Sequence, residues 1–160
     1  MDAPRIAELQ AATGIEPVDS FGMPVLELAQ AARAHEVAAI LHDQLGFDML
    51  LDVTAVDWPG SHLRFEVVWH FWSSRSLQRL RMKTRVSEAT PEVPSLTTLY
   101  GSAAFMEREC HDMLGIVFAG NADLRPILLY EGFQGHPLRK DYDKRHEQPL
   151  VRYRNSPAEG

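Results

Sequence analysis

The sequence predicts an α+β fold: a two-layer domain of helices on a mixed, largely antiparallel sheet, followed by an extended C-terminal tail. Apolar and polar residues alternate over residues 47–58, 63–72 and 77–86, which predicts three successive strands. Apolar residues recur at helical spacing both before and after these strands. Beyond Gly115 both periods vanish while glycines and prolines accumulate, which is typical of irregular chain.

One domain and one tail account for this pattern. The chain has 160 residues and is 45% hydrophobic, which is enough for a single domain with a substantial core. We therefore expect an α+β domain in residues 1–115 and an extended, partner-binding tail in residues 116–160. The tail has scattered aromatic and basic residues but too little pattern to fold alone. We expect it to pack poorly against its own domain.

The first elements along the chain are two helices and two short strands. Residues 3–13 place Ile6, Leu9 and Ala12 on one stripe, and Gly14 would end this helix. Short strands are then expected in residues 16–20 and 23–28, and a longer helix is expected in residues 29–45.

The central strands each have one face suited to burial. In the first of them this face consists of Phe47, Met49, Leu51, Val53 and Ala55. In the last, apolar positions alternate with a cationic row of Arg79, Arg81, Lys83 and Arg85. The row is either a docking surface for an acidic partner or the solvated side of a strand. We favour the second interpretation, because an exposed sheet face requires polar residues in any case.

A short turn and a last helix complete the predicted domain. Ser95 is a suitable N-cap for one helical turn that reaches residue 100. The last helix ends at Gly115 and carries two unlike sides. Its apolar side holds Met106, Cys110, Met113 and Leu114, and its polar side holds Arg108, His111 and Asp112.

Composition and charge exclude several classes of function. No apolar run reaches the roughly 18 residues of a membrane span and no signal-peptide pattern opens the chain, so we expect a soluble, cytoplasmic protein. A single cysteine, Cys110, excludes an internal disulfide and a cysteine-ligated cluster made by this chain alone. Six basic and three acidic residues in 136–154 form a basic tail on an acidic body. With a net charge of -6, such a chain suits an acidic protein surface or anionic lipid better than nucleic acid.

Two groups of residues have the composition of a catalytic site. His35 and Glu36 open a zinc-protease motif, but Ala39 stands where the second histidine ligand belongs. A denser acidic and imidazole cluster would suit a stand-alone metal or acid-base enzyme, and it consists of Glu107, Glu109, His111 and Asp112.

The dense cluster also has a purely structural interpretation. Glu107 with His111, and Arg108 with Asp112, lie at i,i+4, where side chains pair along one helix face. We favour this interpretation, and we expect no catalytic, cofactor-binding or metal-binding residue in the chain. The stand-alone enzyme remains the alternative.

Several separated motifs resemble a known family. They are ERE at 107–109, DMLGI at 112–116, DLR at 123–125 and GFQGHPLRKD at 132–141, with FDMLLDVTAVD at 47–57 and VRY at 151–153. In this order they resemble the 30 kDa subunit family of respiratory complex I, whose bacterial members are the C subunits of NADH-quinone oxidoreductases. The resemblance covers most of the chain from about residue 29 onward.

The resemblance implies a structural role. Members of the family have a two-layer α+β domain and a tail that lies along the 49 kDa-type subunit lining the quinone cavity. They bind no cofactor themselves, so FMN, iron-sulfur clusters and quinone belong to neighbouring subunits. The chain would be a non-catalytic subunit of the peripheral arm of a proton-pumping NADH-quinone oxidoreductase, on the cytoplasmic face of the inner membrane. The alternative is the equivalent subunit of a related membrane-bound hydrogenase or ferredoxin- or F420-linked complex.

The resemblance also marks the residues expected at the interface with partner subunits. These are Glu107, Arg108, Glu109, Asp112, Gly115, Arg125, Gly132, Phe133, Gly135, His136, Pro137, Arg139, Lys140, Arg152 and Tyr153. We expect charge-assisted contacts to the partner from Arg139, Lys140, Arg152 and Arg154. We expect the charged residues between 107 and 112 to fix the angle at which the tail leaves the domain.

Overall fold

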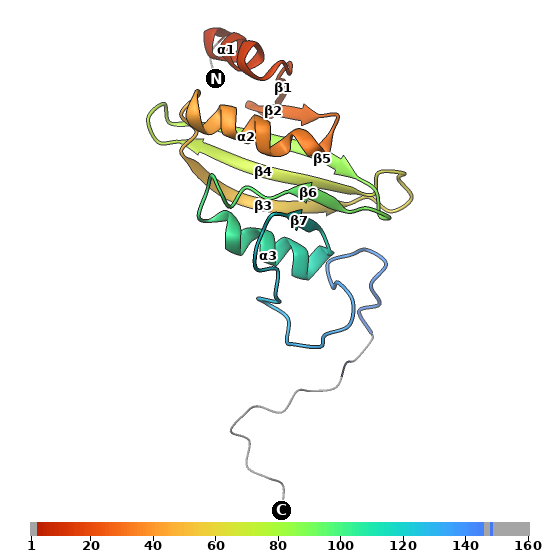
Figure 1. Ribbon diagram of the computed structural model, residues 1–160. Helices are drawn as coiled ribbons and strands as arrows, with labels where there is room; N and C mark the ends of the chain where they lie inside the picture. The colour runs from red at the N-terminus through yellow and green to blue at the C-terminus, as the bar shows by residue number, and fades with distance from the viewer. Residues whose placement is uncertain (1–2, 146–147, 149–160) are drawn as a thin grey trace, which may run out of the picture.

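A computed structural model describes residues 3–145 and residue 148, and it has the predicted α+β architecture (Figure 1). Its elements are α1 (Ala3–Thr13), β1 (Val18–Ser20), β2 (Met23–Leu28), the short 3₁₀ helix η1 (Ala31–Arg33), α2 (Ala34–Asp43), β3 (Met49–Asp57), β4 (Phe65–Ser73), β5 (Gln78–Val86), β6 (Glu92–Pro94), α3 (Ala103–Leu114) and β7 (Val117–Ala119).

Five strands form the main sheet, in the order β1-β2-β5-β4-β3. The pairs β1–β2, β3–β4 and β4–β5 are antiparallel, whereas β2 and β5 are parallel, which confirms the mixed, largely antiparallel sheet. The strands β6 and β7 pair in parallel as a second, smaller sheet. They lie between the two helices, with β6 against α2 and β7 against α3 (Figure 1).

The helices α2 and α3 pack on the same face of the main sheet and share one core with it. Leu41 of α2 and Cys110 of α3 belong to the same buried cluster as Trp69 and Met82 from the strands. The core faces predicted for β4 and β5 are confirmed, because every second residue from Phe65 to Phe71 and from Leu80 to Val86 is buried in this cluster or lies beside it. On the other face of β4, Glu66 and Val68 are also buried. The other face of the sheet has no helix on it among the described residues.

The buried face predicted around β3 is confirmed at Phe47 and Val53 but wrong at Met49 and Leu51. Met49 is 47% exposed and Leu51 is 39% exposed, whereas Leu50 is buried together with Val53. A bulge between Leu50 and Asp52 shifts the register against β4. The extra residue of a bulge reverses which side chains face the core, and a strict two-residue period cannot reveal it.

The expected turn after Ser95 is present. The hydroxyl oxygen of Ser95 accepts a hydrogen bond from the Thr97 backbone N–H at 3.1 Å, and the Tyr100 N–H donates to the Leu96 carbonyl at 2.9 Å. This single turn leads directly into α3. The predicted helix over residues 29–45 is shorter than expected, because its first turn is the 3₁₀ helix η1 and α2 ends at Asp43.

The expectation that the tail packs poorly against its own domain is wrong for its described residues, and its first residues belong to the core. Ile116 is fully buried, Phe118 is 1% exposed, and both belong to the core. Because β7 pairs with β6, the core extends through residue 118 and irregular chain begins only after β7. Whether the remaining tail binds a partner is a separate question, which stays a prediction. Arg152, Tyr153 and Arg154 lie outside the described residues.

Replacing Phe118 should therefore destabilise the domain. Phe118→Ala is expected to lower the free energy of unfolding by about 3–5 kcal/mol, because it leaves a cavity in the core. The measurement is urea denaturation followed by circular dichroism. Phe105→Ala is the matched control, since Phe105 is 63% exposed and should change stability by less than about 0.5 kcal/mol. Equal effects of the two substitutions would contradict the placement of β7 in the core.

Candidate interface: an arm anchored on helix α3

The candidate site is a segment of irregular chain, residues 120–145, which we call the arm. It leaves β7, runs past α3 and returns toward the turn between β3 and β4 (Figure 1). Along this path the arm is bound to its own domain by polar contacts from α3 and from the β3–β4 turn. These contacts use most of the residues that the sequence singles out.

Gly115 lies between the end of α3 and the segment that leads into β7 and the arm. Its backbone has φ +79°, a left-handed conformation that ends α3, and its N–H donates to the His111 carbonyl at 2.7 Å. A Cβ at this position would lie 2.6 Å from Nε2 of His136 and would also collide with the Arg139 guanidinium. The glycine is thus required both by the helix end and by two arm side chains that lie on it.

Glu107 is fully buried, and its carboxylate is held by three donors. Oε1 accepts the Leu96 N–H at 2.7 Å, and Oε2 accepts Ser95 Oγ at 2.8 Å and Asn121 Nδ2 at 2.9 Å. Burial raises the pKa of Glu107, and these hydrogen bonds partly oppose that rise. The residue therefore connects the start of the arm to the turn before α3.

Arg108 binds the backbone of the arm. Its Nε donates to the Arg125 carbonyl and its Nη2 donates to the Pro126 carbonyl, both at 2.9 Å. Asp123 lies 3.8 Å from its Nη1 and is itself paired with Arg125 at 2.8 Å, so Arg125 and the more distant Arg108 hold the pKa of Asp123 well below its usual range.

Asp112 is buried and receives three consecutive backbone N–H groups of the arm. Ile127, Leu128 and Leu129 donate to its Oδ2 at 3.1, 2.9 and 2.9 Å. Burial alone would raise the pKa of Asp112, but the three amides outweigh it and lower the pKa. The carboxylate therefore stays charged and fixes the course of the arm at this point.

Two histidines link the helix end to the arm. His111 Nδ1 lies 2.8 Å from the Ile116 carbonyl and His136 Nδ1 lies 2.9 Å from the Asp112 carbonyl. A carbonyl only accepts, so each Nδ1 carries the proton. Burial and the nearby Arg139 lower the pKa of His136. The arm is further attached by the Leu138 N–H on Met113 O at 3.1 Å and by Arg139 Nε on Leu114 O at 2.8 Å.

The pairings along α3 that the sequence suggested are wrong. Glu107 contacts Ser95, Leu96 and Asn121 rather than His111, and Arg108 contacts arm carbonyls rather than Asp112. The reason is that the neighbouring chain offers unpaired backbone donors and acceptors, which compete successfully with a helix-surface ion pair worth only about 0.2–0.5 kcal/mol. Glu109 is exposed.

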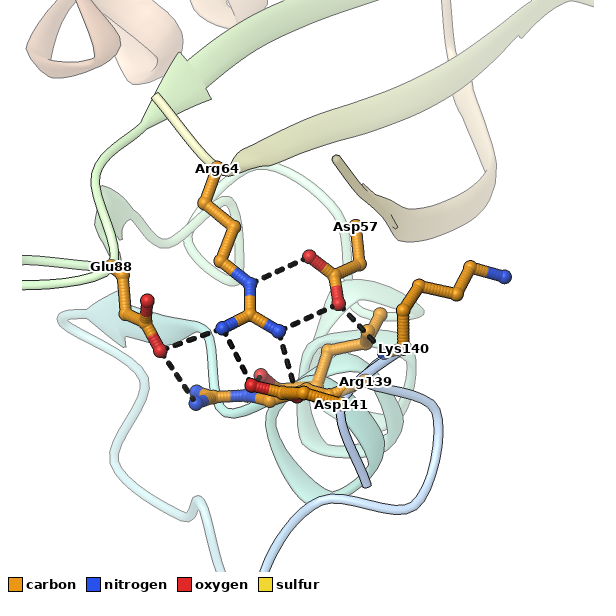
Figure 2. A network of polar contacts seen from close by, with 7 residues as sticks. Asp57, Arg64, Glu88, Arg139, Lys140 and Asp141 are labelled. Carbon is orange, nitrogen blue, oxygen red and sulfur yellow. Dashed lines mark hydrogen bonds and ion pairs between the residues drawn. The ribbon is translucent and has the colours of Figure 1, made fainter. Parts of the chain in front are cut away.

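An ionic cluster with a buried centre and exposed outer carboxylates anchors the far end of the arm (Figure 2). Arg64 is 7% exposed and lies at its centre. It binds Asp57 through two parallel hydrogen bonds, with Nε to Oδ1 at 2.7 Å and Nη2 to Oδ2 at 2.9 Å. It also binds Glu88 at 2.7 Å and Asp141 of the arm at 2.7 Å. The Lys140 backbone N–H completes the cluster by donating to Asp57 at 2.8 Å.

The Arg64 guanidinium sets the charge state of this cluster. Hydrogen bonds from Arg64 hold the pKa of both Asp57 and Asp141 below the usual aspartate range, and the pKa of Arg64 is raised in turn. Arg139 lies beside the cluster, with its guanidinium 4.9 Å from the centre of the Phe65 ring and 3.9 Å from Glu88. The Lys140 side chain points away from Arg64, as Figure 2 shows.

The remaining residues of the family motif lie at the middle of the arm. Phe133 stacks on Tyr142 with ring centres 6.1 Å apart, and Gly135 approaches that tyrosine closely, since an added Cβ would lie 3.1 Å from its ring. Gln148 bridges Tyr142 and Gln134. Gly132, Pro137 and Arg125 belong to the same irregular chain, and Arg125 is exposed.

Sequence reasoning missed several residues that hold the arm. These are Asp57, Arg64, Glu88 and Asn121, together with Ser95 in its role as a hydrogen-bond donor to Glu107. Asp57 and Arg64 carried a weak signal, because a charged residue stands at each end of the turn between two buried strands. No local pattern links Arg64 to Asp141, which is 77 residues away.

No group of three or more metal-ligating side chains occurs among residues 3–145 and 148. Within the same residues no helix has the length and apolar character needed to cross a membrane.

A small cavity of about 150 Å³ lies between α3 and the arm and is lined by His111, Leu129, Phe133 and His136, among others. The geometry therefore describes a clamped segment rather than an open cleft.

The described residues define an α+β domain whose last helix binds an irregular arm. The family model described as "Respiratory-chain NADH dehydrogenase, 30 Kd subunit" matches residues 28–148. The chain belongs to this family.

Particular relatives agree with that assignment. The C subunit of the NADH-quinone oxidoreductase of Paramagnetospirillum magneticum is 47% identical over 115 residues, which are 71% of this chain and 57% of the relative. The corresponding protein of Methylobacterium sp. is 38% identical over 143 residues, which are 86% of this chain and 64% of the relative. The chain thus spans about three fifths of the length of the curated relatives it matches.

Two solved structures share the fold. A trypsin-resistant fragment of Nqo5, residues 1–134, is 32% identical with a TM-score of 0.66, and the match covers 78% of this chain and 100% of the fragment. A chain of the membrane-bound sulfane sulfur reductase, an archaeal respiratory membrane complex, has a TM-score of 0.73 over 92% of this chain and 96% of its own length. At 23% identity the second likeness shows the fold alone.

A side chain at position 115 should loosen the arm. Gly115→Ala is expected to lower the free energy of unfolding by about 1–3 kcal/mol, because the left-handed backbone strains any other residue and the new Cβ displaces His136 and Arg139. Limited proteolysis should then cut the arm faster. Gly101→Ala is the control, since a Cβ at Gly101 meets nothing within 4 Å. Unchanged stability and proteolysis of Gly115→Ala would contradict the described helix end.

The Asp57–Arg64 pair should make stability depend on pH in one direction. The pKa of Asp57 is lowered in the folded chain, so its contribution is complete above the unfolded value of about 3.9 and is lost as pH falls through the folded value. Asp57→Asn is expected to cost about 3–5 kcal/mol at pH 7, because it leaves Arg64 buried without its main partner.

Urea denaturation between pH 7 and pH 2.5 measures this dependence. The difference between wild type and Asp57→Asn should be constant above about pH 4 and should shrink below it. Asp52→Asn changes the same charge at an exposed position and should show neither effect. A difference that stayed constant down to pH 2.5 would show that Asp57 is not titrating as described.

Proposed function

We propose that the chain is a non-catalytic structural subunit of the peripheral arm of a proton-pumping NADH-quinone oxidoreductase. In this role it helps to assemble the quinone-site subunit of the 49 kDa type and the neighbouring iron-sulfur subunits. The observation that carries the proposal is that the motif carboxylates Glu107 and Asp112 are bound by hydroxyl, amide and backbone N–H donors of the chain itself. They hold an arm in place instead of facing a substrate.

The same contacts argue against the alternative of a stand-alone metal or acid-base enzyme. A general base must reach the proton it removes, and a metal-binding carboxylate needs free oxygen lone pairs. Glu107 is fully buried behind three donors, and one oxygen of Asp112 accepts three amides. Glu109 is exposed.

The anchored arm presents apolar side chains to solvent. Leu128 is 61% exposed, Leu138 is 54% exposed and Ile127 is 38% exposed, although the backbone of all three is hydrogen-bonded to α3. Fixed backbone with protruding apolar side chains lowers the entropic cost of binding. We infer that these three residues and the exposed Lys140 side chain contact the partner, whereas Arg139 is occupied by its own domain.

The proposal assigns the redox cofactors to other subunits. FMN, iron-sulfur clusters and quinone would be bound by the partners, and this chain would be peripheral, on the cytoplasmic face of the inner membrane. The second candidate is the equivalent subunit of a related membrane-bound hydrogenase or ferredoxin- or F420-linked complex. The fold shared with a chain of the sulfane sulfur reductase keeps this candidate open. The partners that co-purify with the tagged chain separate the two.

Loss of the arm anchor should weaken assembly before it affects chemistry. Arg108→Ala removes two hydrogen bonds to the arm, and truncation after residue 119 removes the arm while keeping β7 in the core. With the chain tagged in its host, recovery of partner subunits should fall several-fold for Arg108→Ala and to background for the truncated chain. Quinone reductase activity per assembled complex should stay unchanged for Arg108→Ala.

The control is Arg33→Ala, which removes an arginine that contacts Glu36 and the Thr13 carbonyl but no residue of the arm, and it should assemble normally. Two results would overturn the proposal. One is full assembly of the truncated chain. The other is an Arg108→Ala complex that assembles completely but has lost its activity, which would give the motif a chemical role.

A further inference from the structure

The open face of the main sheet lies opposite the core face that α2 and α3 cover. Its most regular feature is the cationic row Arg79, Arg81, Lys83 and Arg85 on β5. The register places these residues opposite Trp72, His70, Val68 and Glu66 of β4, so all eight side chains share the open face. The contacts of the row are unequal along its length.

One half of the row is neutralised within the chain. Glu66 binds Lys83 at 2.8 Å and Arg85 at 3.1 Å, and it also accepts the indole N–H of Trp58 at 3.0 Å. The Arg85 guanidinium lies over the Trp58 ring, 5.4 Å from its centre. These contacts hold Trp58 in a fixed orientation even though it is 45% exposed.

The other half of the row forms no ion pair with any described residue. Among the described residues no carboxylate lies within 4 Å of Arg79 or Arg81, and Nε of Arg81 is buried without an acceptor. Arg79 is exposed and lies over the Trp72 ring at 5.7 Å. His70 lies opposite Arg81 in the sheet register. Burial lowers the pKa of His70, and the positive charges of Arg81, Arg79 and Lys83 lower it further, whereas the negative charge of Asp52 opposes the change. The face is therefore electropositive at this end.

A groove of about 680 Å³ opens at the neutralised end of the row. Trp58 and Leu63 form its apolar wall, and Glu66, Lys83 and Arg85 form its polar side. Leu63 is 41% exposed. Along the strand, Arg81 is two residues from Lys83 at the edge of the groove and Arg79 is four, so the two cations lie about 7 Å and about 13 Å from it.

We propose that this open face is a second docking surface, separate from the arm, for an acidic segment of a neighbouring protein. The segment would place carboxylates against Arg79 and Arg81 and an apolar side chain against Trp58 and Leu63. Tryptophan and arginine in fixed positions beside a groove are the residues that contribute most to protein interfaces. Arginine also binds carboxylate through two parallel hydrogen bonds, which adds geometric specificity.

The charge pattern favours a protein over a phosphate-rich surface. Glu66, Asp52 and Glu27 are interspersed with the cations on this face. A continuous array of phosphates would meet these carboxylates as like charges, whereas a protein segment can place its acidic residues only where the arginines are uncompensated. The proposed occupant is therefore a protein with localised negative charge.

Charge reversal in the assembled complex tests the proposal. Arg79→Glu and Arg81→Glu are made singly and together in the tagged full-length chain, and retention of partner subunits is measured during washing at increasing salt. Each single change is expected to weaken retention about tenfold at 0.15 M salt, and the double change should weaken it further. The difference from wild type should shrink at 0.5 M salt, because exposed charges are then screened.

Three further variants sharpen the measurement. Arg75→Glu makes the same charge change on the exposed turn before β5 and should retain partners as wild type does. Arg79→Lys should keep part of the binding, because the charge remains while the two-bond geometry is lost. Leu63→Asp should weaken retention, because it replaces an apolar side chain of the groove wall by a negative charge. Thermal unfolding of each variant confirms that the domain is intact.

Two outcomes would overturn the inference. The first is wild-type retention of partners by folded Arg79→Glu and by the double variant. The second is binding of wild type, but not of Arg79→Glu, to vesicles of phosphatidylserine and phosphatidylcholine with no change in partner retention, which would assign the face to lipid. Arm variants report separately on the proposed function, so failure of one proposal leaves the other measurable.

Discussion

The arm depends on one physical constraint: irregular backbone can lie against a folded domain only if its N–H and C=O groups find partners. Asp112 satisfies three successive N–H groups and Arg108 satisfies two carbonyls, so α3 supplies what a sheet or helix would otherwise supply. This explains why charged residues lie on a helix face that contacts the protein's own chain. Apolar residues there would leave the polar backbone groups of the arm unpaired, at a cost of about 1–3 kcal/mol each.

The ionic cluster around Arg64, whose Arg64–Asp57 pair is buried, obeys the same constraint with charged groups instead of backbone groups. Ion pairs in a protein interior contribute little net stability, because removing both ions from water is costly. They do specify one arrangement, since misplacing Asp141 would leave Arg64 incompletely paired. The cluster joins the β3–β4 turn, Glu88 and the arm (Figure 2), so it fixes where the arm returns to the domain. The apolar core stabilises the domain, and the charged groups of the cluster fix the position of the arm on it.

Sequence patterns predicted the regular elements well because their signals are local. The alternation in β4 and β5 and the helical spacing of α3 follow directly from which residues contact the core. The bulge between Leu50 and Asp52 could not be predicted, because one extra residue in a strand leaves the apolar composition of the segment unchanged. The partners of Glu107, Arg108 and Asp112 were predicted wrongly because helix spacing describes neighbours on the same helix, whereas their partners arrive from distant chain. Family resemblance identified the motif residues but could not supply these contacts.

The two proposed surfaces lie on different sides of the chain. The arm is fixed to α3, which covers the core face of the sheet, and the cationic row lies on the opposite face. A domain with a binding surface on each side holds two neighbours apart by the combined thickness of one sheet and one helix layer. Rigid spacing of this kind requires a close-packed core and an anchored arm. The buried carboxylates of α3 are thus as important for such a role as the exposed residues that contact partners.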